Sequence, residues 1–574
     1  MNLVHSIKLW SCTGLAILFV LAACSAPTRE KEPTLILTHG HIWTGKDSTD
    51  FVEAIAITEN RITQVGSTES ISALAGPGTK IIDLQGKLAS AGFNDAHIHF
   101  LKGSLGLTQV ELSKAESLKD VISMTQQFIE NNPDKEWITG RGWQYTFFET
   151  GLPDHQTMKF ADIDKPVFIR AYDGHSAYAN KKALAIAGIT SATDFKGFGE
   201  IVKDKKGEPT GTLKESAMGL VDKFVPPPSE DDKLSALLKG LDLIASLGIT
   251  SIQEANGDES NLKLFIKLLK QGELSVRYAA AFSVEENTSR ESIERFSYLK
   301  DSIGLANEYV RADAIKFMID GVIESHSAAM LKPYADLPVE AKARYGSLTM
   351  PIDRYHELVK LVHQKGFRIY THAIGDSAVR VALNAYESVL RENKSRERRH
   401  RVEHIETISS HDIGRFAKLN VLASMEPNHA QPGPGEGVWE RAIGPERLPY
   451  SFAWKALLQS GATLVYSSDW PAAFSLDPIR GLHVAVTRTN PAGFPEGGWI
   501  PEQRISLAQA LKAYTYSGSY SSFEESKKGL IAPGYLADVI VFSEDLFKID
   551  PLGINDTKIL LTIFDGKVIY DQMN

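Results

Sequence analysis

The alternation of helix and strand patterns after residue 229 limits most strongly what this chain can fold into. A capping sequence at Ser229–Asp232 starts an amphipathic helical pattern, and an apolar strand pattern follows at 249–255. The alternation continues toward residue 471. Further strand patterns lie at 276–282, 314–321, 367–376, 400–406, 421–427 and 463–471. Strands separated by helices are typical of an α/β fold with a parallel sheet.

A short apolar segment at 92–100, GFNDAHIHF, supplies one more strand ahead of these seven. Eight strands separated by helices predict a closed (β/α)8 TIM barrel, whose active site lies where the strands end. The stretch from about 101 to 228 is too long for one helical connection. We therefore expect a barrel over residues 91–524 with a large insertion at about 101–228, after its first strand.

Both ends of the chain carry short strand patterns of a different kind. The patterns between residues 34 and 90 are broken by Gly, Asn and Asp, and residues 525–574 have the same character. Flanking segments of this kind can pair with each other. We expect residues 34–90 and 525–574 to form one small β-sandwich domain, built from both chain ends.

The first residues indicate export. Residues 1–23 contain one lysine and then an apolar run that is shorter than the roughly 20 residues needed to span a bilayer, which favours a signal peptide. The sequence LAAC at 21–24 is similar to a bacterial lipobox. This predicts lipidation of Cys24, a tether over residues 24–33, and a lipid anchor as the only membrane attachment, at the periplasmic face of the outer membrane. The alternative is an ordinary signal peptide followed by a chance cysteine.

Composition narrows the class of protein further. The only other cysteine, Cys12, lies in the predicted signal peptide, so the mature chain has no internal disulfide and depends on core burial. The 574 residues carry a net charge of −9, which becomes −10 when residues 1–23 and their single lysine are removed. This balance disfavours a nucleic-acid partner. We interpret the basic run Lys394–Arg401 as a solvated helix end. The sequence is compatible with a homo-oligomer.

Polar residues recur at the ends of the predicted barrel strands. His97 and His99 stand two apart on the first strand, so both side chains face the same side. Lys316 interrupts the apolar fourth strand, where a charge costs free energy unless it is paired or chemically altered. Three more polar residues end the fifth, sixth and eighth strands: His372, His404 and Asp469. We expect all six to converge on one mouth of the barrel as a metal site.

This set resembles the metal ligands of the amidohydrolase superfamily, and the surrounding motifs resemble its amidohydrolase-3 branch, which includes N-substituted formamide deformylases. The resemblance covers essentially everything after residue 34. One departure is Ala91, where members often carry proline. The motifs are DGHSAYANKKAL (173–184), EPTGTLKESA (208–217), KFMIDGVIESHSAAML (316–331), THAIGD (371–376), SDWP (468–471) and GLIAPGYLADVIVF (529–542).

The resemblance implies a role for each polar residue at the mouth. His97 and His99 would hold one divalent metal, expected to be Zn²⁺, while His372 and His404 would hold a second ion or complete the first site. Lys316 matches a lysine that many members carboxylate to bridge two metals. The alternative for Lys316 is a plain ion pair with an acid such as Asp320.

The implied reaction is hydrolysis of a non-peptide C–N bond in a small amide-like molecule by a metal-activated water. Asp469 would contact both metal and water and act as the catalytic acid and base. Two other functions remain open. One is a metal-dependent esterase, lactonase or phosphoesterase on the same site, and the other is a surface lipoprotein that binds a ligand without catalysis.

Four further residues are candidates for substrate contact. His175 lies in the predicted insertion and could hydrogen-bond a substrate or cap a turn. Arg141 and Trp143 could hold a carboxylate and an apolar group, or could anchor a loop. His429 ends the seventh strand and is expected to face the same mouth as the metal ligands.

Overall fold

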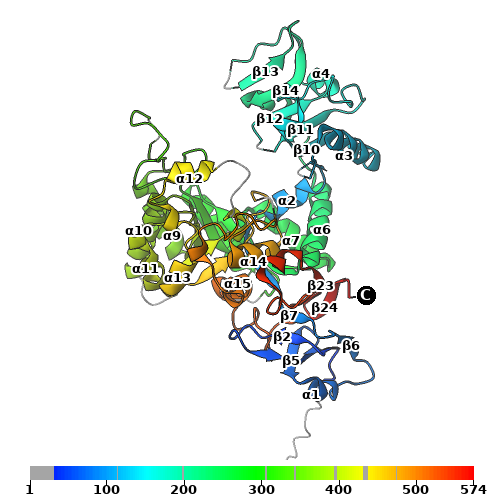
Figure 1. The fold of residues 1–574 in the computed structure, drawn as a ribbon, viewed down its shortest axis with the longest axis vertical. Coiled ribbons are helices and arrows are strands. Elements are labelled where there is room, and N and C mark those ends of the chain that lie inside the picture. The colour runs from blue at the N-terminus through cyan, green and yellow to red at the C-terminus, as the bar shows by residue number, and fades with distance from the viewer. Residues whose placement is uncertain are drawn as a thin grey trace, which may run out of the picture.

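The computed structural model describes residues 31–573, except residues 113, 173, 197–198, 304–306, 342–343, 393–396, 431–436 and 474. The barrel lies in the middle of the molecule, one sheet stands clear above it, and strands from both chain ends lie below it (Figure 1). The predicted signal peptide at 1–23 and Cys24 are outside the described residues, as is most of the predicted tether. In the part of the chain that is described, no helix combines the length and the apolar character that a bilayer crossing requires.

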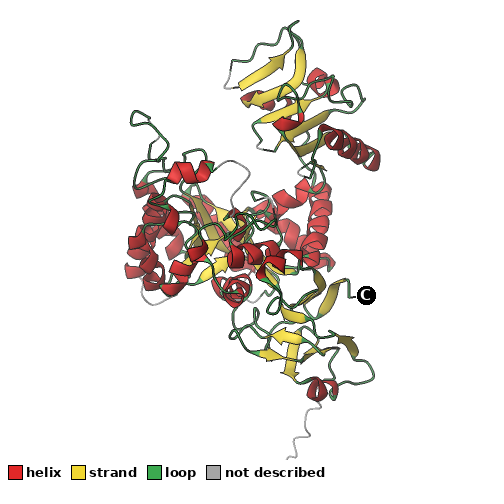
Figure 2. Ribbon diagram, in the orientation of Figure 1, coloured by secondary structure: helices red, strands yellow, loops and turns green. Residues whose placement is uncertain are grey.

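Within the described residues, eight parallel strands form the central sheet (Figure 2). They follow one another around the sheet in chain order, and each overlaps a range in which the sequence predicts a strand. This confirms an α/β fold with a nearly closed parallel barrel. The strands are β8 (Phe93–Ile98), β15 (Ile249–Gly257), β16 (Arg277–Ser283), β17 (Val310–Met318), β18 (Arg368–Ala373), β19 (Arg401–His404), β20 (Leu422–Met425) and β21 (Leu464–Tyr466).

The barrel is completed between the first strand, β8, and the last, β21. Just beyond β21, the backbone N–H of Asp469 donates to the carbonyl of His97 at 2.8 Å, and the N–H of His99 donates to the carbonyl of Trp470 at 2.8 Å. The side chain of Asp95 adds to this seam by accepting the backbone N–H of Ser468 at 3.1 Å. These bonds set Asp469 directly beside the two histidines of the first strand.

Amphipathic helices cover the outside of the barrel. Ser229 and Asp232 form the predicted capping box of α6 (Glu230–Ser246), and the buried side of this helix packs into the main hydrophobic core. The other helices between or after the strands are α7 (Glu259–Gln271), α8 (Arg290–Ile303), α9 (Ile352–Gln364), α10 (Asp376–Glu392), α11 (Ser410–Leu419), α13 (Trp454–Gln459), α14 (Pro478–Thr487) and α15 (Leu507–Tyr514).

The chain between α2 (Phe100–Gly106) and α6 forms the sheet that stands clear of the barrel in Figure 1. Its strand order is β13-β14-β12-β11-β10-β9, and helix α3 (Leu118–Asn131) lies beside it. Trp143 and Tyr178 are at the centre of its own apolar core. The strands are β9 (Val110–Glu111), β10 (Ile138–Trp143), β11 (Val167–Ala171), β12 (Ser176–Ala179), β13 (Gly199–Lys203) and β14 (Pro209–Glu215).

Strands from both chain ends meet in one sheet below the barrel. Its order is β24-β23-β22-β7-β2-β3, and β22 (Val539–Phe542) pairs antiparallel with β7 (Leu88–Ala91). A neighbouring sheet of order β5-β4-β1-β6 shares an apolar cluster with it. The boundaries predicted for the domains stay predictions. The remaining strands are β1 (Leu35–Thr38), β2 (His41–Trp43), β3 (Phe51–Val52), β4 (Ala54–Thr58), β5 (Arg61–Gly66), β6 (Lys80–Asp83), β23 (Ile559–Phe564) and β24 (Lys567–Asp571).

The interpretation of Lys394–Arg401 as a solvated helix end is wrong for the described end of this run. Arg401 is fully buried and donates to Glu403 inside the barrel. Arg399 is also buried, with its guanidinium over the rings of Tyr520 and Phe523 at 3.6 and 4.0 Å. These arginines face inward because buried carboxylates and aromatic rings at this end of the barrel provide partners for them.

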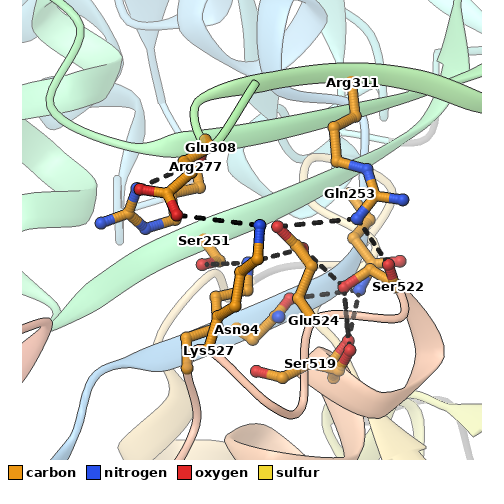
Figure 3. A network of polar contacts seen from close by, with 12 residues as sticks. Asn94, Ser251, Gln253, Arg277, Glu308, Arg311, Ser519, Ser522, Glu524 and Lys527 are labelled. Carbon is orange, nitrogen blue, oxygen red and sulfur yellow. Dashed lines mark hydrogen bonds and ion pairs between the residues drawn. The ribbon is translucent and has the colours of Figure 1, made fainter. Parts of the chain in front are cut away.

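A polar network closes the end of the barrel where the strands begin, opposite the mouth at their carboxyl ends (Figure 3). Helix α16 (Tyr516–Ser521) ends there, and Gln253 donates to its Gly518 carbonyl at 3.0 Å. Arg311 donates to the Ser522 carbonyl at 2.6 Å and lies 3.6 Å from the carboxylate of Glu524. Lys528 pairs with the same carboxylate at 3.0 Å. Barrel strands and the C-terminal part of the chain are thus joined by buried charges.

Glu524 gives this network a testable pH dependence. Burial would raise the pKa of its carboxyl, but the charges of Lys528 and Arg311 outweigh burial and lower the pKa to about 2. Because the folded-state pKa lies below that of the unfolded chain, this stabilisation is complete above about pH 4.5 and is lost as the pH falls toward 2. We expect Glu524→Gln to reduce the free energy of unfolding by about 3 kcal/mol at pH 7.

Thermal unfolding of the wild type and Glu524→Gln at pH 7 and pH 3 checks this expectation. The difference between the two proteins should be large at pH 7 and smaller at pH 3. Glu446→Gln is the control, because Glu446 pairs with Lys332 on the surface and should contribute little. A difference that is equally large at both pH values would contradict the role given to Glu524.

Candidate metal centre

Two histidines and an aspartate meet where β8 and β21 end. The Nε2 atoms of His99 and His97 lie 3.2 and 3.5 Å from Oδ1 of Asp469. That oxygen is buried and has no hydrogen-bond donor in suitable geometry among the described residues. Three potential ligand atoms therefore face one another without bonding to one another. His97, His99 and Asp469 are thereby able to hold one metal ion together.

The other predicted histidines lie next to this group. The ring centroid of His404 is 4.9 Å from that of His97 and 4.5 Å from that of His372. His372 turns Nε2 toward the carbonyl of Gly321 at 3.4 Å and toward Asp320 at 3.5 Å. The structure therefore brings all four histidines predicted as ligands into one cluster.

Lys316 is buried in the same cluster, and its Nζ lies 3.2 Å from Nε2 of His97. Burial lowers the pKa of this ammonium, against the opposing charges of Glu403 and Asp469. Asp320, the alternative partner, instead accepts the backbone N–H groups of Ile374, Gly375 and Ala329 at 2.9 to 3.1 Å. Lys316 is therefore directed at the candidate metal ligands rather than at Asp320.

The protonation states of these groups suit a metal. Burial lowers the pKa of His97 and His372 well below the usual value, and it lowers the pKa of His404 to about 4. Burial alone would raise the pKa of Asp469, but His99, His404 and His429 hold it below its ordinary range. His97, His372 and His404 are thus neutral imidazoles and Asp469 is an ionised carboxylate, which are the forms that coordinate metals.

Each of three candidate ligands has a buried glutamate behind it. Nδ1 of His97 lies 2.8 Å from Glu403, and Nδ1 of His404 lies 2.8 Å from Glu426. His99 faces Glu254 at 3.9 Å. Such carboxylates fix the ring of a metal-ligating histidine and increase its basicity. Sequence reasoning missed these residues, although acids inside the apolar strand patterns 249–255, 400–406 and 421–427 were the available signal.

His429 reaches the same mouth from the turn after β20. Its Nε2 lies 3.8 Å from Oδ2 of Asp469, and its Nδ1 lies 3.7 Å from Glu406. Burial would lower the pKa of His429, but the acids Glu406, Glu426 and Asp469 raise it to about 9. The pocket around Asp469 therefore favours positive charge.

The other three residues predicted to contact substrate lie on the separate sheet of β9 to β14. Trp143 is fully buried in the core of this sheet and donates to the carbonyl of Ile169 at 3.0 Å, which suits the alternative role of a structural anchor. Arg141 donates to the carbonyl of Tyr172 at 2.7 Å. His175 is exposed, lies 3.1 Å from Glu215 and lines an open hollow. The structure does not bring these three to the metal ligands.

A divalent metal fits this donor set. Zn²⁺ in proteins is bound by imidazole nitrogens and carboxylate oxygens, and both kinds of ligand atom are present in this cluster. The surrounding acids supply charge that a cation would balance. Glutamates behind the rings complete the second layer of contacts that such sites require.

Curated proteins of similar sequence span almost the whole chain. Protein LONG AFTER FAR-RED 3 of Arabidopsis thaliana is 30% identical over 547 residues, which are 93% of this chain and 91% of that protein. The N-substituted formamide deformylase of Arthrobacter pascens is 23% identical over 547 residues, covering 94% of this chain and 98% of the deformylase.

Solved structures share the fold. The crystal structure of an uncharacterized metal-dependent hydrolase from Pyrococcus furiosus matches with a TM-score of 0.71 at 24% identity, over 90% of this chain and 99% of that one. The sequence profile of the amidohydrolase family matches residues 80–570. Since this match spans most of the sequence, the chain belongs to the amidohydrolase family of hydrolases.

Proposed function

We propose that this protein is a metal-dependent amidohydrolase that cleaves a non-peptide C–N bond in a small amide-like molecule. The observation that carries the proposal is the meeting of His97, His99 and Asp469 at the barrel mouth, where both Nε2 atoms lie within 3.5 Å of a buried Oδ1 that accepts no hydrogen bond in suitable geometry from the described residues. The similarity to a formamide deformylase supports a C–N bond as the target.

Six residues would hold the metal, and a divalent cation such as Zn²⁺, one or two ions per chain, fits them. When bound, such an ion supplies Lewis acidity, which polarises a substrate carbonyl and makes a water molecule more acidic. The neutral imidazoles are already in the binding state. The six residues are His97, His99, Lys316, His372, His404 and Asp469.

Lys316 decides whether the centre takes one ion or two. Burial favours its neutral amine, which is the form that can attack CO₂. Formation of the N–C bond releases one proton and converts the side chain into a carbamate anion. The carbamate offers oxygen ligands to two ions, whereas an ammonium group would repel them.

Asp469 would carry the proton through the reaction. Its neighbours hold it as a carboxylate, so it can accept a proton from the water that attacks the carbonyl carbon. As the C–N bond breaks, the same proton passes to the leaving nitrogen, and the carbonyl carbon keeps the water oxygen. Two backbone hydrogen bonds hold Asp469 in place for both transfers, one from its own N–H to the His97 carbonyl and one from the N–H of His99 to the carbonyl of the adjacent Trp470.

Metal content tests the metal centre. We expect two equivalents of Zn²⁺ per chain, by elemental mass spectrometry, after purification without chelator. Chelation should abolish hydrolysis and added Zn²⁺ should restore it. Lys316→Ala should retain one equivalent, and added acetate, which can occupy the space of the carbamate, should recover part of the second. Two equivalents in Lys316→Ala without acetate would contradict the bridging role.

Substitution of the proposed acid and base tests the reaction. Asp469→Asn should lower the turnover of N-benzylformamide by about 10² to 10⁴-fold, because the amide group cannot carry the proton. Asp336→Asn is the control, since Asp336 pairs with His326 away from the cluster. Unchanged turnover in Asp469→Asn would contradict the mechanism. Wild-type activity confined to p-nitrophenyl acetate or a lactone would favour the esterase alternative.

We also propose that the mature chain is anchored to the bacterial cell envelope through lipid on Cys24. In a bacterial host, the wild type should be found in the membrane fraction. Cys24→Ser should be found in the soluble fraction or should keep its signal peptide. Metabolic labelling with a radioactive fatty acid should mark the wild type alone. A labelled Cys24→Ser protein would contradict lipidation at this residue.

A further inference from the structure

The position of His429 suggests more than contact with a substrate. The ligand atoms of His404, His429 and Asp469 all lie within 4.8 Å of one another, which is the spacing of a second potential metal group at this mouth. The rings of His404 and His429 are parallel within 4° at a centroid distance of 6.0 Å. Two imidazoles and one carboxylate thus lie within reach of one cation.

Asp469 turns its two oxygens toward different histidines. Oδ1 lies near Nε2 of His97 and His99, at 3.5 and 3.2 Å. Oδ2 lies 3.8 Å from Nε2 of His429. A carboxylate in this position can serve a cation on each side, because each oxygen has lone pairs of its own.

The orientation of His429 follows the same plan as that of two candidate ligands. His97 and His404 turn Nδ1 toward a buried glutamate and leave Nε2 toward the cluster. His429 turns Nδ1 toward Glu406 at 3.7 Å, and Nε2 toward Asp469. A histidine backed by a carboxylate with its other nitrogen free is the usual arrangement of a metal ligand.

Glu406 is itself held in place. It is buried, and its Oε2 accepts the indole N–H of Trp439, the second residue of α12 (Val438–Ile443), at 2.8 Å. The backbone carbonyl of Glu406 also accepts the N–H of Phe452 at 2.9 Å. These contacts come from two separate parts of the chain and fix the glutamate behind His429.

We propose that His429 is a ligand of the metal centre, coordinating a divalent cation through Nε2 together with His404 and Asp469, and that Glu406 and Trp439 are positioning residues for it. This inference rests on the proposed metal-dependent function. It adds a ligand from the turn after β20 to the six residues expected from the sequence.

The Zn²⁺ affinity of the full chain tests this inference without any substrate. Metal-free wild type and His429→Gln are titrated with Zn²⁺ in competition with a chromophoric chelator. We expect His429→Gln to lower the affinity for at least one equivalent of Zn²⁺ by tenfold or more. Glu406→Gln should weaken the same equivalent by about 10 to 100-fold, as loss of a carboxylate behind a ligand does. Trp439→Phe should have a smaller effect in the same direction.

His326→Gln is the matched control. His326 also follows a barrel strand, its side chain is 23% exposed against 19% for His429, and it pairs with Asp336 at 2.9 Å. The Zn²⁺ affinity of His326→Gln should equal that of the wild type. Circular dichroism and thermal unfolding of each variant check that the fold is intact.

A second measurement separates ligation from an indirect effect. The visible absorption of Co²⁺-loaded protein reports the ligand atoms, so His429→Gln should change the spectrum. In His429→Ala, added imidazole should restore both the spectrum and the affinity, since the partly exposed site admits it. If His429→Gln binds every equivalent of Zn²⁺ with an affinity within tenfold of that of the wild type, the inference is overturned. A role for His429 in substrate contact is then favoured. A wild type that binds no Zn²⁺ overturns the proposed function itself.

Discussion

The closure of the barrel between β8 and β21 is the constraint on which the site depends. Two backbone hydrogen bonds and the side chain of Asp95 join the end of β8 to the residues that follow β21. They bring Asp469 next to His97 and His99, which are 372 and 370 residues earlier in the chain. Without this seam the strand that carries the proposed proton carrier would have no fixed position relative to the strand that carries two ligands.

Burial of charge is the second condition that shapes this mouth. Buried carboxylates cost free energy unless they have partners. Glu403 bonds His97 and Arg401, and Glu426 bonds His404 and Ser467. The same contacts that offset the cost of burying these carboxylates also orient the rings of His97 and His404. Desolvation also keeps His97 and His404 neutral, so stability of the folded core and readiness of these two rings for a metal have one physical origin.

Much of the site could be predicted because it obeys simple rules of strand geometry. His97 and His99 share a face since side chains on a strand alternate, and His372, His404 and Asp469 end parallel strands whose ends meet at one mouth. The acids behind the histidines were visible in the strands but had no assigned partner. Arg399 shows the opposite error: a basic run suggested a solvated helix end, and packing buried this arginine.

The sequence by itself determined the barrel, the order of its strands and the residue types at their ends, because periodicity and strand spacing are local properties of the chain. Only the tertiary structure decided which carboxylate stands behind which histidine, and that Lys316 faces His97 rather than Asp320. It also placed Arg141 in β10 and His175 next to β12, on a sheet apart from the barrel, and set His429 beside Asp469 at the barrel mouth. These pairings join residues far apart in sequence, and no local pattern encodes the distance between them.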